Sequence, residues 1–412
     1  MTDRPGCPVS HLDLLDPDTF ENGVPRDAFR QVREAQPVYW FPQPEAHSGG
    51  FWVVTLLEDV QEISRQPAVF SSAERGAIFT GKTAVDEEVM LASTGMLMLN
   101  MDPPQHSAQR RVVQRAFTPR VIRDLEVRLK DIAAEIVERA LAKGEGDFVR
   151  DIAAELPLLA ICELIGIPAE DRTKIFDWTN RLIGFDDPEL SSSQADGELA
   201  MMEMYGYSAG LAEQRAAEPT GDIISLLLQS DFHGEKLSPD EFNIFFLLLC
   251  VAGNETTRNA IAHGMKAFFE HPKQWELFKT TRPLETAVDE IIRWATPVIE
   301  FQRTAQEDYV LRGQQIRKGE RVVLYYSSAN RDSTTLTDPD VFDITRKDND
   351  HVAFGGGGPH FCLGAQLARA EVRIIFEAIA DRMPDLAPTA PARLLRSAFL
   401  DGIKALPVRY TP

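Results

Sequence analysis

Cysteine is scarce in this sequence, and no apolar run approaches the length that a membrane span needs. The chain has 412 residues and only four cysteines, too few and too scattered for a disulfide framework, so a reducing compartment is expected. The longest apolar stretch, residues 244–253, falls well below the ~18–20 residues that a span requires. The chain starts with MTDRPG, which contains no apolar signal segment. We therefore expect a cytoplasmic protein without a membrane span.

Positive charge is also in short supply. Lys and Arg number 43 against 63 Asp and Glu, which gives a net charge of −20. Nucleic acids and anionic membranes bind surfaces of the opposite sign, so neither is expected as a partner. The sequence also lacks a flavin or dinucleotide fingerprint. Apolar residues nevertheless make up 44% of the chain, which excludes a largely disordered protein and predicts a globular one.

The pattern of apolar residues predicts a mainly α protein with a minor β part. Apolar residues recur at three- and four-residue spacing over 121–141 and 152–165, and 191–217 is a further helical candidate. Runs rich in β-branched and aromatic residues predict strands at 38–41, 51–56 and 322–325. A last helix is expected from about residue 364 to 383. Neither a repeat nor a linker divides the sequence, so we expect one domain over residues 1–412, with its β-richer part at about 1–100.

The most informative predicted helix begins at Ser238 and ends near Pro272. Ser238 and Glu241 match a capping box, and Pro239 suits the first helical position. Because residues 245–251 are apolar on all sides, this helix should pass through the protein interior. Residues 252–257 nevertheless read AGNETT, and a carboxylate and two hydroxyls are costly inside a core unless they are paired. This local violation indicates either a functional site or a satisfied polar patch where the helix reaches the surface.

A glycine-rich segment near the carboxyl end, residues 351–364, reads HVAFGGGGPHFCLG. It places Cys362 at a turn before the last helix, where the helix dipole and free N–H groups favour a thiolate. Four glycines suggest a phosphate loop, but the Lys-Ser/Thr ending of that motif is missing. No second cysteine lies within zinc spacing, so a single axial thiolate to one metal fits better. The remaining interpretation is an inert buried cysteine beside a loop.

Three segments, in this order, resemble the bacterial cytochrome P450 family over nearly the whole chain. They are AGNETT at 252–257, Glu290-Ile-Ile-Arg293, and the glycine-rich cysteine loop at 351–364. The Glu-x-x-Arg pair alone is a common helical pair, whereas the ordered set is very specific. The resemblance implies the cytochrome P450 fold, a helical prism with small β-sheets. Haem b (iron protoporphyrin IX) would lie between the long central helix and the cysteine loop.

The resemblance assigns roles to individual residues. Cys362 matches the ligand of the haem iron, whose thiolate pushes electron density onto the metal and favours O–O cleavage. Thr256 and Glu255 match the acid–alcohol pair that relays protons to dioxygen, and the helix would open at Gly253. Further haem contacts are implied for Ala252, Gly253, Phe354 and Gly364.

Charged residues have two implied roles. Haem b carries two propionates, so this acidic protein must supply local cations to them. On a helix, residues i and i+4 share a face, so His106 and Arg110 can point at one carboxylate together. The residues implied to contact the propionates are His106, Arg110, Arg303 and His360. A structural ion cluster in the core is implied for Glu290, Arg293 and Arg346.

One departure concerns the cysteine loop, because Phe354 precedes Cys362 by eight residues where the family's usual motif has seven. The position of the Phe354 ring is therefore left open. A loop of this length resembles the subset that oxidises terminal methyl groups of steroid side chains and methyl-branched lipids. Segments 49–54, 70–74, 186–189 and 252–259 resemble the same subset.

The substrate implied by this resemblance is an apolar steroid side chain, terpenoid or branched lipid. The pocket wall would come from five regions, namely residue 79 with 90–99, 178–185, 245–252, 298–299 and 397–400. These regions are mostly apolar, and plain core packing is the alternative for any one of them. The residues predicted to line the pocket are Phe79, Met98, Leu249, Val298, Ile299 and Phe399.

Electrons would pass from NAD(P)H through a ferredoxin reductase and a ferredoxin, because the chain has no nucleotide site of its own. We expect an acidic ferredoxin to dock on a basic patch formed by Arg111, Arg115, Arg120, Arg369 and Arg373. We expect a monomer, since no coiled-coil heptads are present. The predicted activity is insertion of one oxygen atom from O2 into an unactivated C–H bond. The alternatives are a peroxide-driven peroxygenase, which an intact Glu255–Thr256 pair disfavours, and a non-catalytic haem protein that binds or senses a ligand.

Overall fold

Helices dominate the fold, in agreement with the prediction of a mainly α protein with a minor β part. The computed structural model describes residues 4–79, 88, 91, 94–183, 187–189, 194–220, 222–229 and 238–410. The α-helices are α1 (Arg26–Ala35), α2 (Leu57–Ser64), α4 (Gln105–Val113), α5 (Pro119–Lys143), α6 (Glu155–Ile165), α7 (Arg172–Ile183), α8 (Gln194–Ala217), α9 (Ile223–Gln229), α10 (Pro239–Glu270), α11 (Pro272–Thr281), α12 (Leu284–Ala295), α13 (Tyr326–Ala329) and α14 (Ala365–Arg382). Short 3₁₀ or π turns occur at Pro17–Phe20, Met98–Asn100, Gln114–Phe117, Val149–Ala153 and Ala169–Asp171.

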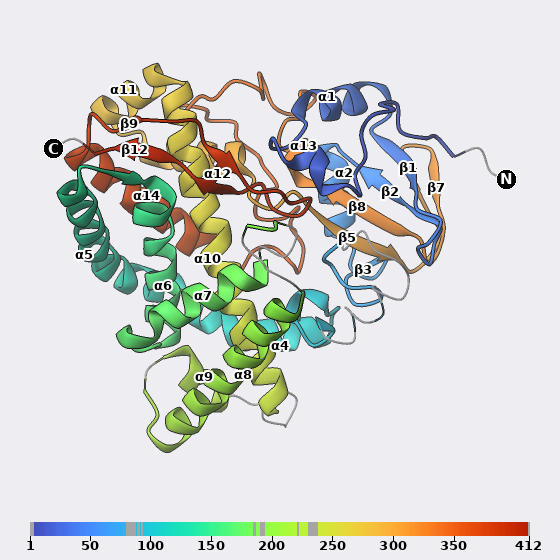
Figure 1. The fold of residues 1–412 in the computed structure, drawn as a ribbon. Helices are drawn as coiled ribbons and strands as arrows, with labels where there is room; N and C mark the ends of the chain where they lie inside the picture. Colours follow the sequence, from blue (N-terminus) through green and yellow to red (C-terminus); the bar gives the residue numbers. More distant parts are fainter. Residues whose placement is uncertain are drawn as a thin grey trace.

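The strands form small sheets. They are β1 (Val38–Pro42), β2 (Gly50–Val54), β3 (Phe70–Ser71), β4 (Glu145–Asp147), β5 (Glu300–Ala305), β6 (Tyr309–Leu311), β7 (Gln314–Ile316), β8 (Arg321–Tyr325), β9 (Ala387–Pro388), β10 (Arg393–Leu394), β11 (Ile403–Ala405) and β12 (Pro407–Arg409). The largest sheet lies on the side of the molecule opposite most helices, whereas β9 and β12 lie among the helices near α11 and α14 (Figure 1). The largest sheet has the order β1-β2-β8-β5-β3. Strand β2 runs parallel to β8, while β5 runs antiparallel to β8 and pairs Arg303 with Val322. Strand β5 therefore lies between β8 and β3 in this sheet.

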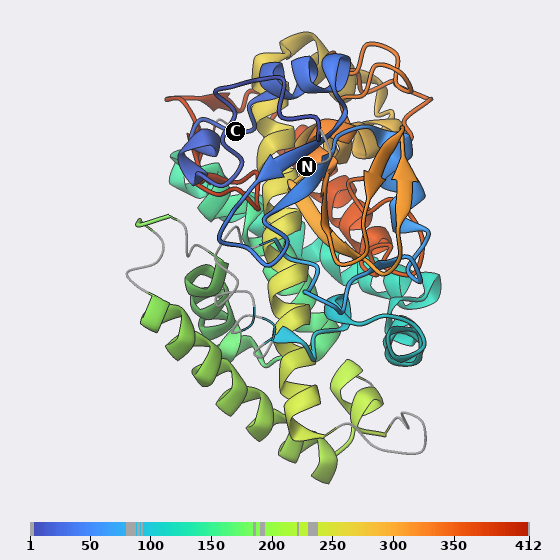
Figure 2. The same cartoon turned by 90° about the vertical axis from the view of Figure 1, so that its right-hand side faces the viewer.

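The central helix is α10, which runs the length of the molecule in Figure 2. Its N-terminus is the expected capping box: the Glu241 N–H donates to Ser238 Oγ (3.2 Å), and the Ser238 N–H donates to Glu241 Oε2 (2.8 Å). Most of the helix is buried, and it packs against α6, α7, α8 and α12. The helix is continuous from Pro239 to Glu270, through the residue at which an opening was expected, Gly253.

Most predicted elements are present, with shifted ends. The helix expected over 152–165 begins at Glu155, after the turn at Val149–Ala153, and Pro157 lies in its first turn, where a missing N–H breaks no helical hydrogen bond. The strand expected over 51–56 ends at Val54, because α2 follows at Leu57. The helix expected from residue 191 is described from Gln194 onward.

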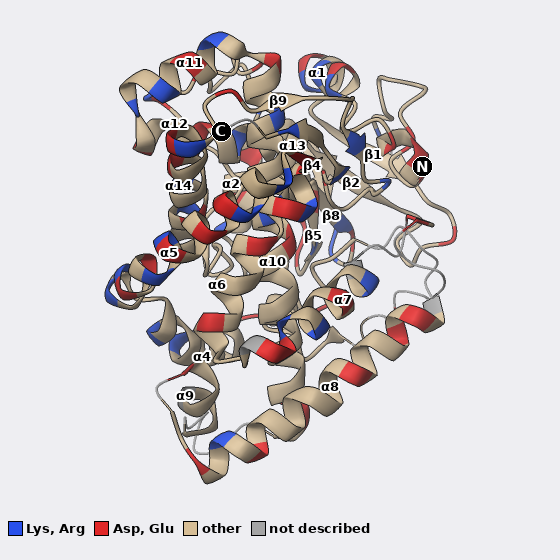
Figure 3. Cartoon of the chain, turned by 60° about the vertical axis from the view of Figure 1, so that its left-hand side comes forward, with Lys and Arg blue, Asp and Glu red and all other residues tan. Residues whose placement is uncertain are grey.

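Charges of both signs cover the outer helices, as Figure 3 shows for α5, whereas α8 carries mainly acidic residues. The apolar core is divided between a helical cluster, which includes α5, α6, α10 and α14, and two clusters on the faces of the large sheet. Across the described part of the chain, no helix combines the length and the apolar character that crossing a membrane requires.

Candidate active site

Cys362 lies in the loop that precedes α14 and faces an internal cavity beside α10. Its backbone N–H donates to the Phe354 carbonyl oxygen (2.9 Å), which closes the loop on itself. Although the loop lies inside the fold, the cysteine is exposed to the cavity. Burial raises the pKa of the Cys362 thiol, against the opposing effects of the Gly364 N–H and of the Arg110 and Arg369 charges. The free thiol is therefore protonated at neutral pH, and a metal cation on sulfur would favour the thiolate.

The glycines of this loop press against α2. A Cβ atom on Gly356 would lie 2.6 Å from Ser64 Oγ and 2.7 Å from the Val60 carbonyl oxygen. A Cβ atom on Gly358, whose φ is +72°, would lie 2.3 Å from the Ser64 carbonyl oxygen. No larger residue fits at either position without moving α2 or the loop. The glycines therefore allow the loop backbone to approach α2 closely, and this contact fixes the position of the cysteine relative to α2.

The Phe354 ring, whose position the longer loop left open, packs inside the loop. The Arg369 guanidinium carbon lies 4.6 Å from the ring centroid. The Phe361 ring lies 6.3 Å away and the His351 ring 6.0 Å away, measured between centroids. Phe354 also lines the cavity. The additional loop residue therefore leaves this ring next to the cysteine.

The cavity brings together all nine predicted haem contacts and also Thr256. Those that line it are His106, Arg110, Ala252, Gly253, Thr256, Arg303, Phe354, His360, Cys362 and Gly364. Ala252 is exposed in the middle of a buried helix because its side chain opens into this space. Gly253 is needed for packing, since a Cβ atom there would lie 3.0 Å from Ile161 Cδ1. The structure therefore brings together residues that are far apart in the sequence.

Four nitrogen-bearing side chains line one part of this cavity without a carboxylate partner. Arg303 is buried and donates to the Gln302 carbonyl oxygen (2.6 Å), while Arg110 donates to the Phe361 carbonyl oxygen. Among the described residues, neither arginine forms an ion pair. The His106 and His360 rings lie 4.1 Å apart, and His106 Nδ1 and His360 Nε2 are buried without a hydrogen-bond partner.

Burial and mutual repulsion keep this cluster from being fully charged. Burial, helped by the Arg110 charge, lowers the pKa of His106 to about 4. Burial, helped by Arg303 and by His106, lowers the pKa of His360 to about 2. Buried donors and cations that lack an anion form a site for carboxylates. Together with a cysteine facing an apolar space, they fit a flat iron porphyrin with two propionates.

Thr256 and Glu255 are neighbours on α10, but only Thr256 lines the cavity. The Thr256 hydroxyl donates to the Ala252 carbonyl oxygen (2.8 Å). The Glu255 carboxylate is buried and accepts hydrogen bonds from Arg258 and from Asn259 Nδ2 (3.2 Å). The prediction of an adjoining acid–alcohol pair is therefore not met in this conformation. Arg258, one helical turn further on, holds the carboxylate away from the cavity.

Hydrogen bonds connect the polar residues around Glu255 to α7. Arg258 Nη1 donates to Asn180 Oδ1 (2.9 Å), and Asn254 Nδ2 donates to Thr179 Oγ1 (3.2 Å). Glu255 Oε2 remains buried without a partner. The polar residues that violate the apolar pattern of α10 are thus held mainly by α10 itself, with Asn254 bonded to α7.

Three of the six predicted pocket residues line the cavity, namely Met98, Leu249 and Val298. Phe79 instead packs on Phe51 of β2, with 4.7 Å between ring centroids, and is buried in a core cluster beside the sheet. Ile299 is buried in the same cluster, because successive residues of an extended chain point to opposite sides and Val298 takes the cavity side. These two predictions are wrong.

The prediction for Phe399 is also wrong, because its ring packs edge-on against Phe301 (5.8 Å between centroids) and Phe301 takes the place at the cavity. Trp178 is buried outside the lining, while Met90 and Phe185, which belong to the predicted regions, lie outside the described residues. Other residues line the cavity without having been predicted to do so, including Ala77, Phe117, Ile161, Ile292, Phe301 and Tyr326. For Phe301, its position two residues before Arg303 on one strand was an available signal.

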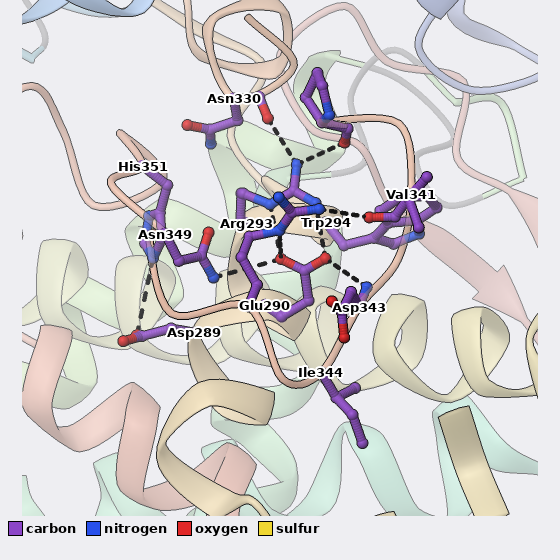
Figure 4. Close-up of polar contacts among 12 residues, drawn as sticks. Asp289, Glu290, Arg293, Trp294, Asn330, Val341, Asp343, Ile344, Asn349 and His351 are labelled. Atoms are coloured by element: carbon purple, nitrogen blue, oxygen red, sulfur yellow. Dashed lines mark hydrogen bonds and ion pairs between the residues drawn. The ribbon is translucent and has the colours of Figure 1, made fainter. Parts of the chain in front are cut away.

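The structural cluster around Glu290 is confirmed (Figure 4). Glu290 and Arg293 are fully buried and form two hydrogen bonds of 2.8 Å. Arg346 Nε donates to Glu290 Oε2 (3.2 Å), as predicted. The Asp343 N–H donates to Glu290 Oε1 (2.9 Å). Arg293 Nη1 donates to the carbonyl oxygens of Asn330 (2.8 Å) and Pro339 (2.9 Å). Every charge in this cluster is therefore compensated.

Within the described ranges, no group of three His, Cys, Asp or Glu side chains is arranged to hold a metal ion directly. The site that the structure does contain is a single thiol facing a flat apolar cavity, with anion-free donors at its edge. A fold of this kind, with a cysteine loop below a long helix, defines a haem-thiolate protein.

Comparisons with known proteins support this class. Residues 274–382 match the cytochrome P450 family. The steroid C26-monooxygenase of Rhodococcus jostii (strain RHA1) is 49% identical over 411 residues, covering 99% of this chain and 86% of that protein. The methyl-branched lipid omega-hydroxylase of Mycobacterium bovis (strain ATCC BAA-935 / AF2122/97) is 40% identical over 424 residues, covering 100% and 97%. The solved structure of a Mycobacterium marinum cytochrome P450 in complex with pseudoionone matches with a TM-score of 0.91 at 35% identity, with 100% of both chains covered.

The chain belongs to the cytochrome P450 family. It is a haem-thiolate monooxygenase that uses iron protoporphyrin IX and O2 to oxidise an apolar substrate. The fold, the cofactor and the reaction class agree with the predictions from the sequence.

Proposed function

We propose that this enzyme hydroxylates a terminal methyl carbon on the branched side chain of a steroid or of a similar lipid. The relatives named above act, by their names, on the C26 position of steroids and on the terminal end of methyl-branched lipids. The observation that carries the proposal is the apolar cavity wall opposite Cys362, to which Phe245, Leu248 and Leu249 contribute. Such a wall recognises a substrate by removing apolar area from water, at about 25 cal/mol per Å².

We also propose how the haem is held. Cys362 would bind the iron, and Ala252, Gly253, Phe354 and Gly364 would lie against the ring. The propionates would take the places that the anion-free donors leave open, with Arg110 and Arg303 as cations and the two imidazoles as hydrogen-bond donors. When bound, haem supplies the activation of dioxygen and the attack on an unactivated C–H bond.

The protein would supply protons from α10. The Thr256 hydroxyl is at the cavity surface and can donate a hydrogen bond as well as accept one. Glu255 would deliver protons to Thr256 only after its carboxylate leaves Arg258. The apolar lining excludes bulk water, so proton delivery would depend on these two groups.

Substrate binding and product analysis test this function. A steroid with an unmodified branched side chain should displace water from ferric iron, which shifts the Soret band, and turnover should give the terminal alcohol. Thr256→Ala should lower product formed per electron about tenfold or more, in the range for loss of a proton-transfer group. Thr257→Ala, on the same helix, is the matched control and should cost less. If the wild type hydroxylated ring carbons, terminal hydroxylation would be contradicted. If Thr256→Ala kept the wild-type yield of product per electron, the role of Thr256 in proton transfer would be contradicted.

We propose a ferredoxin as the electron donor, docked near the cysteine loop. Arg111, Arg115 and Arg120 are exposed, and no described carboxylate forms an ion pair with them. The other two arginines of the expected patch differ: Arg369 pairs with Asp289 (2.7 Å) and Arg373 with Glu126 (2.7 Å). The proposed docking patch therefore consists of the first three arginines, on α4, the turn after it and the start of α5.

The docking site is tested by charge reversal. Arg111→Glu combined with Arg115→Glu should slow reduction by an acidic ferredoxin, with a weaker dependence on salt, and leave the substrate-induced spectral shift unchanged. Lys273→Glu, which reverses one charge on the exposed face of α11, should leave both unchanged, whereas Arg111→Glu alone, with the same charge change, should already slow reduction. Equal loss of both readouts in the double variant would reject the patch.

A further inference from the structure

The side chain of Gln302 is buried in β5 between two residues that line the cavity, Phe301 and Arg303. Its Nε2 atom donates to three backbone carbonyl oxygens, those of Arg75 (3.0 Å), Gly76 (3.2 Å) and Ile78 (3.3 Å). Because all three neighbours are acceptors, this atom must be the amide nitrogen. The Gln302 backbone N–H adds a fourth bond, to the Ala77 carbonyl oxygen (2.8 Å).

A second buried amide holds the same loop from the opposite side. Asn100 Oδ1 accepts a hydrogen bond from the Ala77 N–H (2.8 Å). Asn100 Nδ2 donates to the carbonyl oxygen (3.0 Å) and to the hydroxyl (3.2 Å) of Thr94. Ala77 is thus bound through its N–H by Asn100 and through its carbonyl by the backbone of Gln302.

The residues that these amides hold form one wall of the cavity. Ala77, Met98 and Leu99 all line it, and they come from the two described stretches that flank the segment between residues 79 and 94. Further out on the same two stretches, Asp102 Oδ1 accepts a hydrogen bond from the Ser72 N–H (2.8 Å). The wall is therefore fixed at several points, and Gln302 is the point at which it joins the strand that carries Arg303.

We propose that Gln302 and Asn100 form an amide clamp, a pair of positioning residues that set the distance between this apolar wall and the haem-binding strand. Neither side chain lines the cavity, so both would act through Ala77, Met98 and Leu99. When this wall is held in a fixed position, the cavity beside it admits the end of an alkyl chain and keeps the adjacent carbons away from the reacting centre. The clamp thus determines which carbon reacts, and this inference rests on the proposed terminal hydroxylation.

Variants of Gln302 test the clamp in the full-length holoenzyme. Gln302→Leu removes the donor, and Gln302→Glu keeps the shape while turning the donor into an acceptor. Both should raise the ratio of internal to terminal alcohol, and the spectral dissociation constant for the steroid, by about tenfold, the cost of unpairing buried carbonyls. The ferrous carbonyl band near its haem-thiolate position should remain, because Arg303 and Cys362 are untouched. Gln306→Leu is the matched control on the same chain segment, since Gln306 Nε2 contacts only the nearby Thr304 carbonyl oxygen (3.3 Å).

The outcomes separate the clamp from the proposed function. If Gln302→Leu and Gln302→Glu keep the wild-type product ratio and dissociation constant, the clamp is wrong. If wild type itself gives no terminal alcohol, the proposed function fails, and a shift in the product pattern between wild type and variants still supports the clamp. Should a Gln302 variant not bind haem, Asn100→Asp serves instead. It keeps the acceptor for the Ala77 N–H, removes the bond to the Thr94 carbonyl oxygen and should shift the product ratio in the same direction.

Discussion

Two groups of buried arginines lie in this protein, and they differ in how their charges are compensated. In the group formed by Glu290, Arg293 and Arg346, a carboxylate and several carbonyl oxygens take up nearly every donor. In the group around Arg110 and Arg303, each guanidinium donates to one carbonyl oxygen, Arg303 also bonds Tyr326, and neither forms an ion pair with a described carboxylate. The first group holds the protein together, while the second is complete only when an anion arrives.

The difference gives a way to recognise a binding site in a protein with many more acidic than basic residues. Carboxylates are abundant in this chain, with 63 Asp and Glu, and yet none of the described ones pairs with Arg110 or Arg303. A buried cation left without a partner is costly unless a ligand supplies the charge. The compensated cluster should therefore respond to mutation through folding, and the uncompensated cluster through haem affinity.

The largest effect is expected for Glu290→Gln. This change leaves Arg293 and Arg346 buried without their carboxylate, which should lower the free energy of unfolding by about 3–5 kcal/mol. Denaturant unfolding of the haem-free and haem-loaded protein measures it, and both forms should lose the same amount. A loss confined to the haem-loaded form would place this cluster with the binding groups.

Arg303→Leu should show the opposite pattern. Haem affinity should fall about 10–100-fold, the range for losing a hydrogen bond to a charged group. The free energy of unfolding of the haem-free protein should stay unchanged or rise, because burial already lowers the pKa of Arg303. Haem titration followed at the Soret band measures the first quantity and denaturant unfolding the second. Arg303→Lys, which keeps the charge, is the control and should recover part of the affinity.

The pH dependence of the haem-free protein contains contributions from His106 and His360, and mutation separates that of His106. The pKa of His106 is about 4 in the folded protein against 6.5 ordinarily, so between these values the unfolded chain binds more protons. Stability should therefore fall as the pH drops from about 6.5 to about 4, by at most about 1.4 kcal/mol per pH unit. His106→Gln should remove this part of the slope, as measured by urea unfolding at several pH values. Haem binding should reduce the slope too, since a propionate favours the charged imidazole; equal slopes in all three samples would refute the assignment.

The smallest effect is expected for Arg369→Gln. Arg369 and its partner Asp289 are both about one-third exposed, unlike either buried group, and such pairs contribute less than about 1 kcal/mol. The variant should shift the unfolding midpoint slightly and leave haem affinity nearly unchanged. A large loss of haem affinity would mean that the contact of Arg369 with the Phe354 ring supports the cysteine loop more strongly than its exposure indicates.

Residues with a local signature could be predicted from the sequence. The capping box at Ser238 fixed the start of α10, and the glycine loop with its following helix located Cys362. His106 and Arg110 share a helical face, and both line the cavity as the spacing predicted. The contact between Arg346 and Glu290 came from the family resemblance, because no local pattern links them.

Other features depend on tertiary contacts that no local pattern contains. The orientation of Glu255 is set by Arg258 and, through it, by Asn180 on α7. A shift of one residue along an extended chain decides that Val298 faces the cavity while Ile299 faces the sheet core. Phe117 and Ile161 reach the cavity because of how helices pack, which periodicity alone does not specify.

The contact between the glycine loop and α2 has a consequence for how this enzyme can be altered. Because helix carbonyls occupy the space where side chains at Gly356 and Gly358 would project, the tract behaves as a rigid spacer between α2 and Cys362, the proposed iron ligand. Even one methyl group there would force the loop or α2 to move, and Cys362 would be displaced with the loop. Attempts to tune the redox properties by loop mutagenesis should therefore start from residues whose Cβ positions are open, and should treat α2 as part of the metal's environment.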